Sequence, residues 1–420
     1  MPPSQPIRAV RGVRDVLPAE RALWQLVEST ARSVASSFGY QEIQTPIIEP
    51  AELVERVGES TDVVQKEMYR FQDRGERWLV LRPEATAGVV RAYFEGNLSQ
   101  GVQPARLQCI GPMFRYDRPQ AGRYRQFHQF NFEAIGDPSP GLDAEAVELA
   151  WTWLARLGLR RVSLRLNSIG DASCRPQYLD ALRDHYRPVA GSLCENDRRR
   201  LETNPLRLLD CKEEACQPFK AGAPRILDHL CEDCAAAFAE VRRLLDSAGI
   251  EYVLDPFLVR GLDYYTRTVF ELQHESIGGA QNSLGGGGRY DGLAAAMGWP
   301  ATPGVGFAGG IERVVEMMRR DGEEVVAAAP ADLVVVPDGD LGTAAGEAAR
   351  IAREAGVRVI VDHTSRSLKA KMRGANRVGA RWVAVMNAGE AGRRVVQLRD
   401  MAAGEQVEVG WDDLPEAVRP

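Results

Sequence analysis

Residues 258–271 are Leu-Val-Arg-Gly-Leu-Asp-Tyr-Tyr-Thr-Arg-Thr-Val-Phe-Glu, and residues 285–293 are Gly-Gly-Gly-Gly-Arg-Tyr-Asp-Gly-Leu. Apolar residues alternate between Tyr265 and Leu272, which predicts a β-strand. Polar and charged side chains crowd the start of this strand: Arg260, Asp263, Tyr264 and Tyr265. Four consecutive glycines then allow a backbone to come close to a ligand. Such a composition is unsuited to a core and suited to holding a small polar molecule.

The length and composition of the chain limit its class. A chain of 420 residues predicts two or three domains, and 45% hydrophobic with 26% charged residues is typical of a globular protein. No apolar run approaches the roughly 18 residues of a membrane span, and no secretory signal is visible. We therefore expect a cytoplasmic protein with no membrane association. The net charge of −6 argues against a uniformly basic nucleic-acid binder but allows local basic patches.

Seven cysteines are present, and in the cytoplasm they should be reduced. The last four have the spacing Cys-x4-Cys followed by Cys-x2-Cys, which is similar to a zinc ribbon apart from the unusual first gap. They are Cys211, Cys216, Cys231 and Cys234. Two interpretations are open: a structural Zn²⁺ held by four thiolates, or reduced cysteines with no special role.

Hydrophobic spacing divides the chain into two parts. In the first part we expect helices at 19–38, 83–97, 142–157 and 310–319, and strands at 42–48, 78–81, 106–114 and 126–135. A mostly helical block from about 170 to 245 interrupts this strand-rich core. An acidic and then alanine-rich passage at 322–331 predicts a linker. Beyond it, strands at 333–336, 357–361 and 382–386 alternate with helices at 341–355 and 367–379, an order that implies a parallel sheet.

A second polar segment spans residues 113–133, Met-Phe-Arg-Tyr-Asp-Arg-Pro-Gln-Ala-Gly-Arg-Tyr-Arg-Gln-Phe-His-Gln-Phe-Asn-Phe-Glu. Two predicted strands flank a loop rich in arginine, whose planar guanidinium stays charged and makes the paired hydrogen bonds that phosphates need. A solvated hairpin tip would explain the loop alone. It would not explain the following strand, where polar residues alternate with phenylalanines up to Glu133, because an inward polar group is costly unless it is paired. We therefore expect a binding site here.

Shorter segments have simple structural explanations when each is taken alone. Residues 81–86, Leu-Arg-Pro-Glu-Ala-Thr, are typical of a helix N-terminus with a favourable acidic first turn. Residues 304–314, Gly-Val-Gly-Phe-Ala-Gly-Gly-Ile-Glu-Arg-Val, are typical of a glycine-rich strand that packs closely before a helix.

Taken together, these segments resemble the histidyl-tRNA synthetase family of class II aminoacyl-tRNA synthetases, in order and over nearly the whole chain. Residues 45–50, 113–133 and 304–314 resemble motifs 1, 2 and 3, and the two segments quoted first resemble the histidyl signature segments. The resemblance implies an α+β fold: an antiparallel-sheet catalytic domain over 1–325 with the helical insertion, then an α/β anticodon-binding domain over 331–420. Asp117 stands where many members carry Glu, Asn131 where some carry Gly, and Val13 where many carry Thr.

The resemblance also implies residue roles. Arg115 and Arg260 would bind the α-phosphate of ATP, Arg313 the γ-phosphate, and Phe127 would stack on adenine. The implied histidine contacts are Glu84, Thr86, Gln129, Glu133, Tyr265 and Tyr290. The implied tRNA contacts are Gln120, Arg123 and Arg125 in the motif 2 loop and Lys369 and Arg373 in the C-terminal domain. These last two belong to a basic cluster that could equally be a solvated helix face, but an anticodon-binding domain favours RNA. The cluster contains Arg366, Lys369, Lys371, Arg373, Arg377 and Arg381.

The implied reaction is ATP-dependent ligation of L-histidine to tRNA(His) through a histidyl-adenylate, with release of AMP and pyrophosphate. Mg²⁺ and a homodimer are expected with it, and no side chain is an evident general base. One alternative is a non-catalytic paralogue that serves as a regulatory subunit of ATP phosphoribosyltransferase. Another is an RNA-binding sensor with an inactive site. The three arginines at 115, 260 and 313 favour the synthetase over both, and the residues beyond 331 count against the regulatory paralogue.

Overall fold

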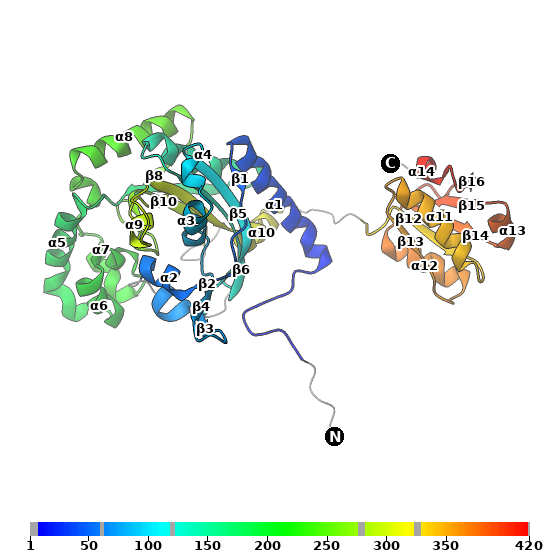
Figure 1. Ribbon diagram of the computed structural model, residues 1–420, viewed down its shortest axis with the longest axis horizontal. Coiled ribbons are helices and arrows are strands. Elements are labelled where there is room, and N and C mark those ends of the chain that lie inside the picture. The colour runs from blue at the N-terminus through cyan, green and yellow to red at the C-terminus, as the bar shows by residue number, and fades with distance from the viewer. Residues whose placement is uncertain (1–6, 59–62, 118–121, 276–281, 323–328, 419–420) are drawn as a thin grey trace, which may run out of the picture. The chain divides into compact units, whose positions relative to one another are not determined.

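The computed structural model of the chain describes residues 7–58, 63–117, 122–275, 282–322 and 329–418. Two compact units are present, Met1–Val325 and Val326–Pro420 (Figure 1). Among the described residues, no helix combines the length and the apolar character that crossing a membrane requires.

A large sheet forms the centre of the first unit, with the strand order β1-β5-β6-β11-β10-β9-β7-β8. Its neighbouring strands from β5 to β7 are antiparallel, and only the two edge pairs are parallel. The strands are β1 (Gln41–Glu42), β5 (Ala105–Phe114), β6 (Gln126–Ile135), β7 (Val162–Ser168), β8 (Val253–Leu254), β9 (Thr266–His274), β10 (Ser283–Arg289) and β11 (Gly304–Gly310). The predicted α+β fold with an antiparallel core is therefore confirmed.

Helices cover one face of this sheet, and the other face combines a second apolar cluster with polar residues. The covering helices are α1 (Pro18–Ser37), α4 (Pro140–Arg156), α8 (Glu232–Ser247) and α10 (Ile311–Arg320). Because side chains alternate along a strand, Phe130 and Phe132 of β6 join the core under these helices, whereas Glu133 faces Thr86 and Tyr290. The second face also receives α3 (Thr86–Glu95) and α9 (Leu293–Ala296), and η2 (Leu98–Gln100) follows α3.

A small sheet lies beside the main one and changes one expectation. It contains β2 (Ile48–Pro50), β4 (Trp78–Leu81) and β3 (Tyr69–Gln72), accompanied by α2 (Ala51–Gly58) and η1 (Val63–Glu67). The single strand predicted at 42–48 is wrong, because β1 and β2 belong to different sheets. Pro46 lies between them and has no N–H group to continue a ladder.

The helical insertion follows β7. It consists of short elements: α5 (Arg175–Tyr186), η3 (Arg187–Ser192), α6 (Glu195–Thr203), η4 (Pro205–Asp210), η5 (Glu214–Cys216), α7 (Gln217–Lys220) and η6 (Ile226–Asp228). These elements share a small core built around Tyr178, Tyr186 and Leu208. By contrast, Phe238, Val241 and Leu245 of α8 pack into the core of the main sheet. Helix α8 therefore closes the insertion and returns the chain to the sheet.

The second unit is an α/β sheet with the order β13-β12-β14-β15-β16. Its strands β12 (Leu333–Pro337), β13 (Val359–Val361) and β14 (Trp382–Met386) are parallel, as predicted, and β15 (Val395–Asp400) and β16 (Gln406–Gly410) add an antiparallel hairpin. Helices α11 (Gly342–Glu354) and α14 (Leu414–Ala417) pack on one core, and α12 (Leu368–Val378) packs on another. Helix α13 (Ala388–Gly392) begins with a capping box between Asn387 and Glu390.

Candidate active site

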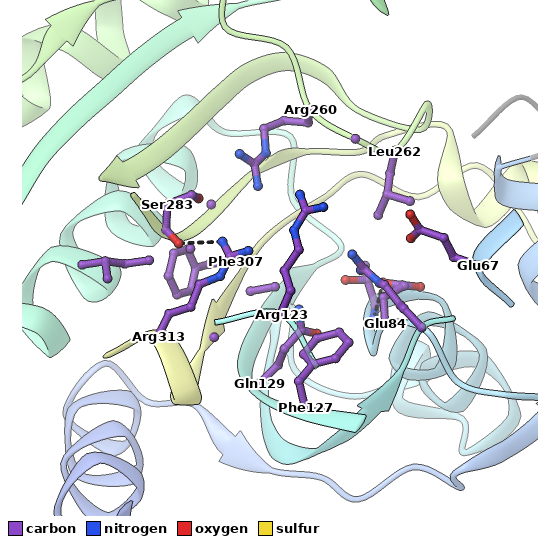
Figure 2. A pocket seen from close by; sticks show the side chains of 18 of the residues that line it. Glu67, Glu84, Arg123, Phe127, Gln129, Arg260, Leu262, Ser283, Phe307 and Arg313 are labelled. Atoms are coloured by element: carbon purple, nitrogen blue, oxygen red, sulfur yellow. Dashed lines mark hydrogen bonds between the residues drawn. The ribbon is translucent and has the colours of Figure 1, made fainter. Parts of the chain in front are cut away.

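A cavity of about 530 Å³ opens over strands β6, β10 and β11 and the segment that precedes β9. Eleven of the residues with predicted roles line it: Glu84, Thr86, Arg115, Arg123, Phe127, Gln129, Glu133, Arg260, Tyr265, Tyr290 and Arg313. They come from positions 84 to 313 of the sequence, and the antiparallel sheet places them side by side. In Figure 2, Arg123, Arg260 and Arg313 point toward a common space, with Glu67 and Glu84 to one side. The cavity is therefore divided into a cationic and an acidic part.

Glu133 is the centre of the acidic part. Only 1% of its surface is exposed. Its two oxygens accept the Thr86 hydroxyl at 2.7 Å and the Tyr290 hydroxyl at 2.5 Å. Gly306 on the neighbouring strand makes room for this carboxylate, since a Cβ there would lie 1.8 Å from its Oε2. Burial raises the pKa of Glu133 to about 8, although the hydrogen bonds from Tyr290 and Thr86 act in the opposite direction.

The rest of the acidic part surrounds Glu133 with hydroxyl groups. Burial raises the pKa of Tyr265 to about 12 and that of Tyr290 well above its ordinary value, so both phenols stay protonated at neutral pH. Glu84 accepts the backbone N–H groups of Thr86 and Ala87 at the start of α3. Glu84 therefore caps the N-terminus of α3 from a position just before the helix, whereas the simpler interpretation of residues 81–86 predicts an acidic residue in the first turn, and it lines the cavity as well.

Arg260 and Arg313 form the cationic part with two arginines of the motif 2 segment. Arg260 lies against Gly286, where a Cβ would come within 2.6 Å of its guanidinium carbon, and it forms an ion pair with Glu271. Burial lowers the pKa of Arg313, and the nearby charges of Arg123 and Arg115 lower it further. Such mutual repulsion is relieved by an anion, so this part of the cavity is suited to phosphate.

Two buried polar atoms in the cavity wall have no hydrogen-bond partner among the described residues. They are Nε of Arg260 and Oε1 of Gln129. Buried polar groups are rarely left unsatisfied in a complete structure. A bound ligand with both acceptor and donor groups would satisfy them.

Arg115 is held in place by its surroundings. Its Nε donates to the carbonyl of Pro83 at 2.9 Å, and its guanidinium carbon lies 5.4 Å from the centre of the Phe127 ring. The side chain therefore crosses from the end of β5 to the loop before α3 and lines the cavity.

The residues predicted to contact tRNA do not all line the cavity. Arg123 lines the cavity, whereas Arg125 stacks on Tyr116 with its guanidinium carbon 4.0 Å from the ring centre. Gln120 lies outside the described residues. Lys369 and Arg373 are exposed on α12 of the second unit. Lys371, a member of the predicted basic cluster, is instead buried and donates to the carbonyl of Pro337 at 2.7 Å.

Several cavity residues were not predicted. The insertion contributes Arg200, Arg207, Asp210 and Lys212 to the lining. Nη1 of Arg207 donates to the carbonyl of Arg260 at 3.1 Å, and Asn204 donates to Asp263 at 2.8 Å. Glu312, next to the predicted Arg313, accepts the backbone N–H of His128 at 2.9 Å. Of the residues just named, only Glu312 could have been found from the sequence, because it lies inside the segment 304–314.

The prediction that Cys211, Cys216, Cys231 and Cys234 could form one zinc site is wrong, because the structure divides them between two groups. Cys211 and Cys216 gather with Cys194 and Asp197, whereas Cys231 and Cys234 gather with Cys174 and Asp171. The reason is topological: the first pair packs at the start of α6, and the second pair lies at the start of α8, beside the loop between β7 and α5.

The raised pKa of Glu133 predicts a pH-dependent stability. Between its ordinary pKa of about 4.5 and its folded pKa of about 8, the folded chain keeps a proton that the unfolded chain has released. The contribution of the Glu133 proton to the free energy of unfolding is thus complete below pH 4.5 and is lost as the pH rises from there through 8. Relative to Glu133→Gln, which does not titrate, the free energy of unfolding of the wild type should fall by up to about 1.4 kcal/mol per pH unit. Urea unfolding of both proteins from pH 5 to 8 measures this, and parallel profiles would contradict it.

Comparisons with known proteins agree with this geometry. Residues 12–314 match the histidyl-tRNA synthetase family, and residues 332–420 match the anticodon binding domain family. The histidine–tRNA ligase of Desulforudis audaxviator is 49% identical over 411 residues, 97% of each chain. That of Moorella thermoacetica is 48% identical over 401 residues, 95% of each chain. The crystal structure of apo S. aureus histidyl-tRNA synthetase has a TM-score of 0.83 and 36% identity, and the match covers 98% of this chain and 99% of that one. The chain therefore belongs to the histidyl-tRNA synthetase family.

Proposed function

We propose that the chain ligates L-histidine to tRNA(His) in two steps, with ATP as the energy source. One observation carries the proposal: a single cavity joins a cluster of arginines to a buried carboxylate surrounded by hydroxyl groups. The arginines suit the phosphates of ATP, and the carboxylate with its hydroxyls suits an imidazole, which has one hydrogen-bond donor and one acceptor when neutral.

In the first step the carboxylate of histidine attacks the α-phosphorus of ATP, and pyrophosphate leaves. Arg115 and Arg260 bind the α-phosphate from two sides and stabilise the negative charge that develops on it. Arg313 binds the γ-phosphate of the leaving group, and Mg²⁺ accompanies the phosphates of ATP. Phe127 stacks on the adenine. Most of the acceleration then comes from orientation and electrostatic stabilisation.

Histidine occupies the acidic part of the cavity. Glu84 binds its α-ammonium group beside Thr86, and Gln129 lines the same pocket. Glu133, Tyr265 and Tyr290 surround the imidazole and supply both kinds of hydrogen-bonding group. Charge and shape thus select histidine over smaller amino acids and over aromatic ones without ring nitrogens.

In the second step a ribose hydroxyl of the terminal adenosine attacks the adenylate, and AMP leaves. Gln120, Arg123 and Arg125 of the motif 2 loop contact the acceptor end, and Lys369 and Arg373 contact the anticodon region. The protein acts as a homodimer in the cytoplasm, with no membrane association.

The direct test is exchange of labelled pyrophosphate into ATP across a panel of amino acids, followed by charging of tRNA(His). We expect exchange with histidine alone and accumulation of histidyl-tRNA. A folded protein that binds ATP but supports no exchange would favour the regulatory paralogue instead.

A variant of the second unit separates tRNA binding from adenylation. Both Lys369 and Arg373 are exposed on α12, so replacing both by alanine should leave the fold intact. We expect weaker tRNA binding, a salt dependence of binding reduced by about one unit of slope for each lost phosphate contact, and unchanged pyrophosphate exchange. Arg350→Ala, on the exposed surface of α11 where Arg350 pairs with Glu354, is the matched control. Equal effects of the control and the double variant would contradict the assignment.

A further inference from the structure

Six of the seven cysteines lie in the insertion, and the fold sorts them into two clusters. The α5 cluster contains Asp171, Cys174, Cys231 and Cys234. The α6 cluster contains Cys194, Asp197, Cys211 and Cys216. In each cluster one carboxylate oxygen and three sulfurs all lie within 4.8 Å of one another. Each cluster thus offers four ligand atoms of the types that bind zinc.

The spacing of these atoms fits a tetrahedral zinc site. A Zn–S bond of about 2.3 Å places neighbouring sulfurs roughly 3.8 Å apart. The sulfurs of Cys194 and Cys211 are 3.9 Å apart. A disulfide would require about 2.05 Å, and all the cysteines are free thiols. The sulfurs are therefore placed for a shared metal ion and not for a covalent bond.

Each cluster is assembled from two short sequence pairs. The α5 cluster joins Asp171-x2-Cys174 to Cys231-x2-Cys234, and the α6 cluster joins Cys194-x2-Asp197 to Cys211-x4-Cys216. Three of these four pairs have the two-residue gap that is typical of zinc sites. In two of these three pairs the gap is visible in the sequence only if aspartate counts as a ligand.

Neighbouring groups orient the ligands as a metal site requires. The carboxylate of Asp171 pairs with Arg267 through Oδ2 at 3.1 Å and turns Oδ1 toward Cys174. The carboxylate of Asp197 pairs with Arg200 at 3.1 Å. Hydrogen bonds from outside the ligand set fix ligand orientation and tune metal affinity. Each cluster therefore has its own arginine to fix the carboxylate.

Backbone groups favour sulfur ligands as well. The N–H of Cys194 donates to the sulfur of Cys216 at 3.3 Å, and the N–H of Asp197 donates to the sulfur of Cys194 at 3.4 Å. Such bonds stabilise the thiolate, which is the form that binds a metal. At the other cluster, Gly170 has φ +63° and a Cβ there would lie 2.7 Å from the sulfur of Cys174. Glycine thus leaves room for this sulfur.

We propose that the insertion holds two structural Zn²⁺ ions, one in each cluster, each bound by three thiolates and one carboxylate. Soft thiolate ligands select zinc over magnesium or calcium. The insertion consists of short helices around a small core, and segments of this kind are commonly stabilised by metals.

Both sites connect to the wall of the active-site cavity. In the α6 cluster, Cys211 lies between Asp210 and Lys212, which line the cavity together with Arg200 of α6. In the α5 cluster, Arg175 follows Cys174 and donates to the carbonyl of Tyr265 at 2.8 Å. By this proposal zinc fixes the insertion against the segment that ends at Tyr265, just before β9.

The test is the metal content of the full chain, purified without chelators from a zinc-supplemented culture. We expect two equivalents of zinc in the wild type, one in Cys216→Ala, one in Cys234→Ala, and none in the double variant. Cys109→Ala is the matched control: Cys109 is buried in β5 and belongs to neither cluster, so this variant should keep two equivalents. A wild-type zinc content no higher than background would overturn the proposal. If the wild type holds one equivalent and only one of the two single variants loses it, the cluster whose variant keeps its zinc holds no metal.

Two measurements on the wild type alone test the proposal even if the variants fail to fold. A mercurial reagent that titrates the thiols should release two equivalents of Zn²⁺ to a coloured chelator. Reconstitution of the stripped chain with Co²⁺ should give a thiolate-to-cobalt charge-transfer band that saturates at two equivalents. Absence of both signals would overturn the proposal. Neither signal depends on adenylation, so a failure of the zinc proposal can be distinguished from a failure of the proposed function.

Discussion

Arg260→Gln should lower histidine-dependent pyrophosphate exchange by about 10²- to 10³-fold, the effect of losing one preorganised group that stabilises transition-state charge. The guanidinium group of Arg260 is held by Glu271, and its Nε is buried without a partner among the described residues. Burial lowers the pKa of Arg260, but the negative charge of Glu271 overcomes this and raises it. The positive charge is therefore in place before ATP binds, and glutamine cannot supply it.

The distribution of the loss between kcat and KM tests the role. A group that acts on charge developing in the transition state lowers kcat, whereas one that only binds ATP raises KM. We expect most of the loss in kcat. Arg161→Gln is the control, since Arg161 is about half exposed and pairs with Asp321 outside the cavity; it should retain full exchange. A loss confined to the KM for ATP would show that Arg260 only binds the nucleotide.

The strands that carry the site could be predicted because their pattern is local. The alternation of phenylalanine with polar residues predicts the strand at 126–135, which is β6, and the strand Trp78–Leu81 is also found with its predicted bounds. The pairing of strands could not be predicted in the same way. Gly306 opposes Glu133 across β11 and β6, although these residues are far apart in sequence. Nothing in the local pattern of residues 304–310 indicates that a carboxylate fills the space above Gly306.

The contribution of the insertion was hidden for a related reason. Arg207 reaches the carbonyl of Arg260, but residues 205–210 form a 3₁₀ helix with no clear hydrophobic period. The cysteine pairs were visible, yet their partners depend on which ends of the insertion meet. An acidic residue can replace one cysteine of a Cys-x2-Cys pair, and a count of cysteines alone then assigns the wrong pairs. The grouping of the cysteines and the contact between Arg207 and Arg260 therefore depend on contacts between distant segments, which local spacing does not reveal.

The second large effect concerns the choice of amino acid. Above pH 8, where Glu133 is ionised, Glu133→Gln should lower kcat/KM for histidine by about 5- to 150-fold, which corresponds to the 1–3 kcal/mol cost of an unsatisfied buried group. Both oxygens of Glu133 accept hydroxyl groups, from Thr86 and Tyr290. An amide has one oxygen and one NH₂ group, so one of these hydroxyls loses its acceptor and faces a donor. The KM for ATP should not change, because the arginines are untouched.

Two further variants make this result specific. Glu145→Gln removes a carboxylate that pairs with Arg106 outside the cavity, and it should leave kcat/KM for histidine unchanged. Tyr290→Phe removes one of the donors to Glu133, so its effect should not add to that of Glu133→Gln, as expected for groups in direct contact. Additive losses, or a change in the KM for ATP alone, would place Glu133 outside the histidine pocket. Non-additive losses would show that the buried carboxylate and its hydroxyl neighbours recognise the imidazole as one unit.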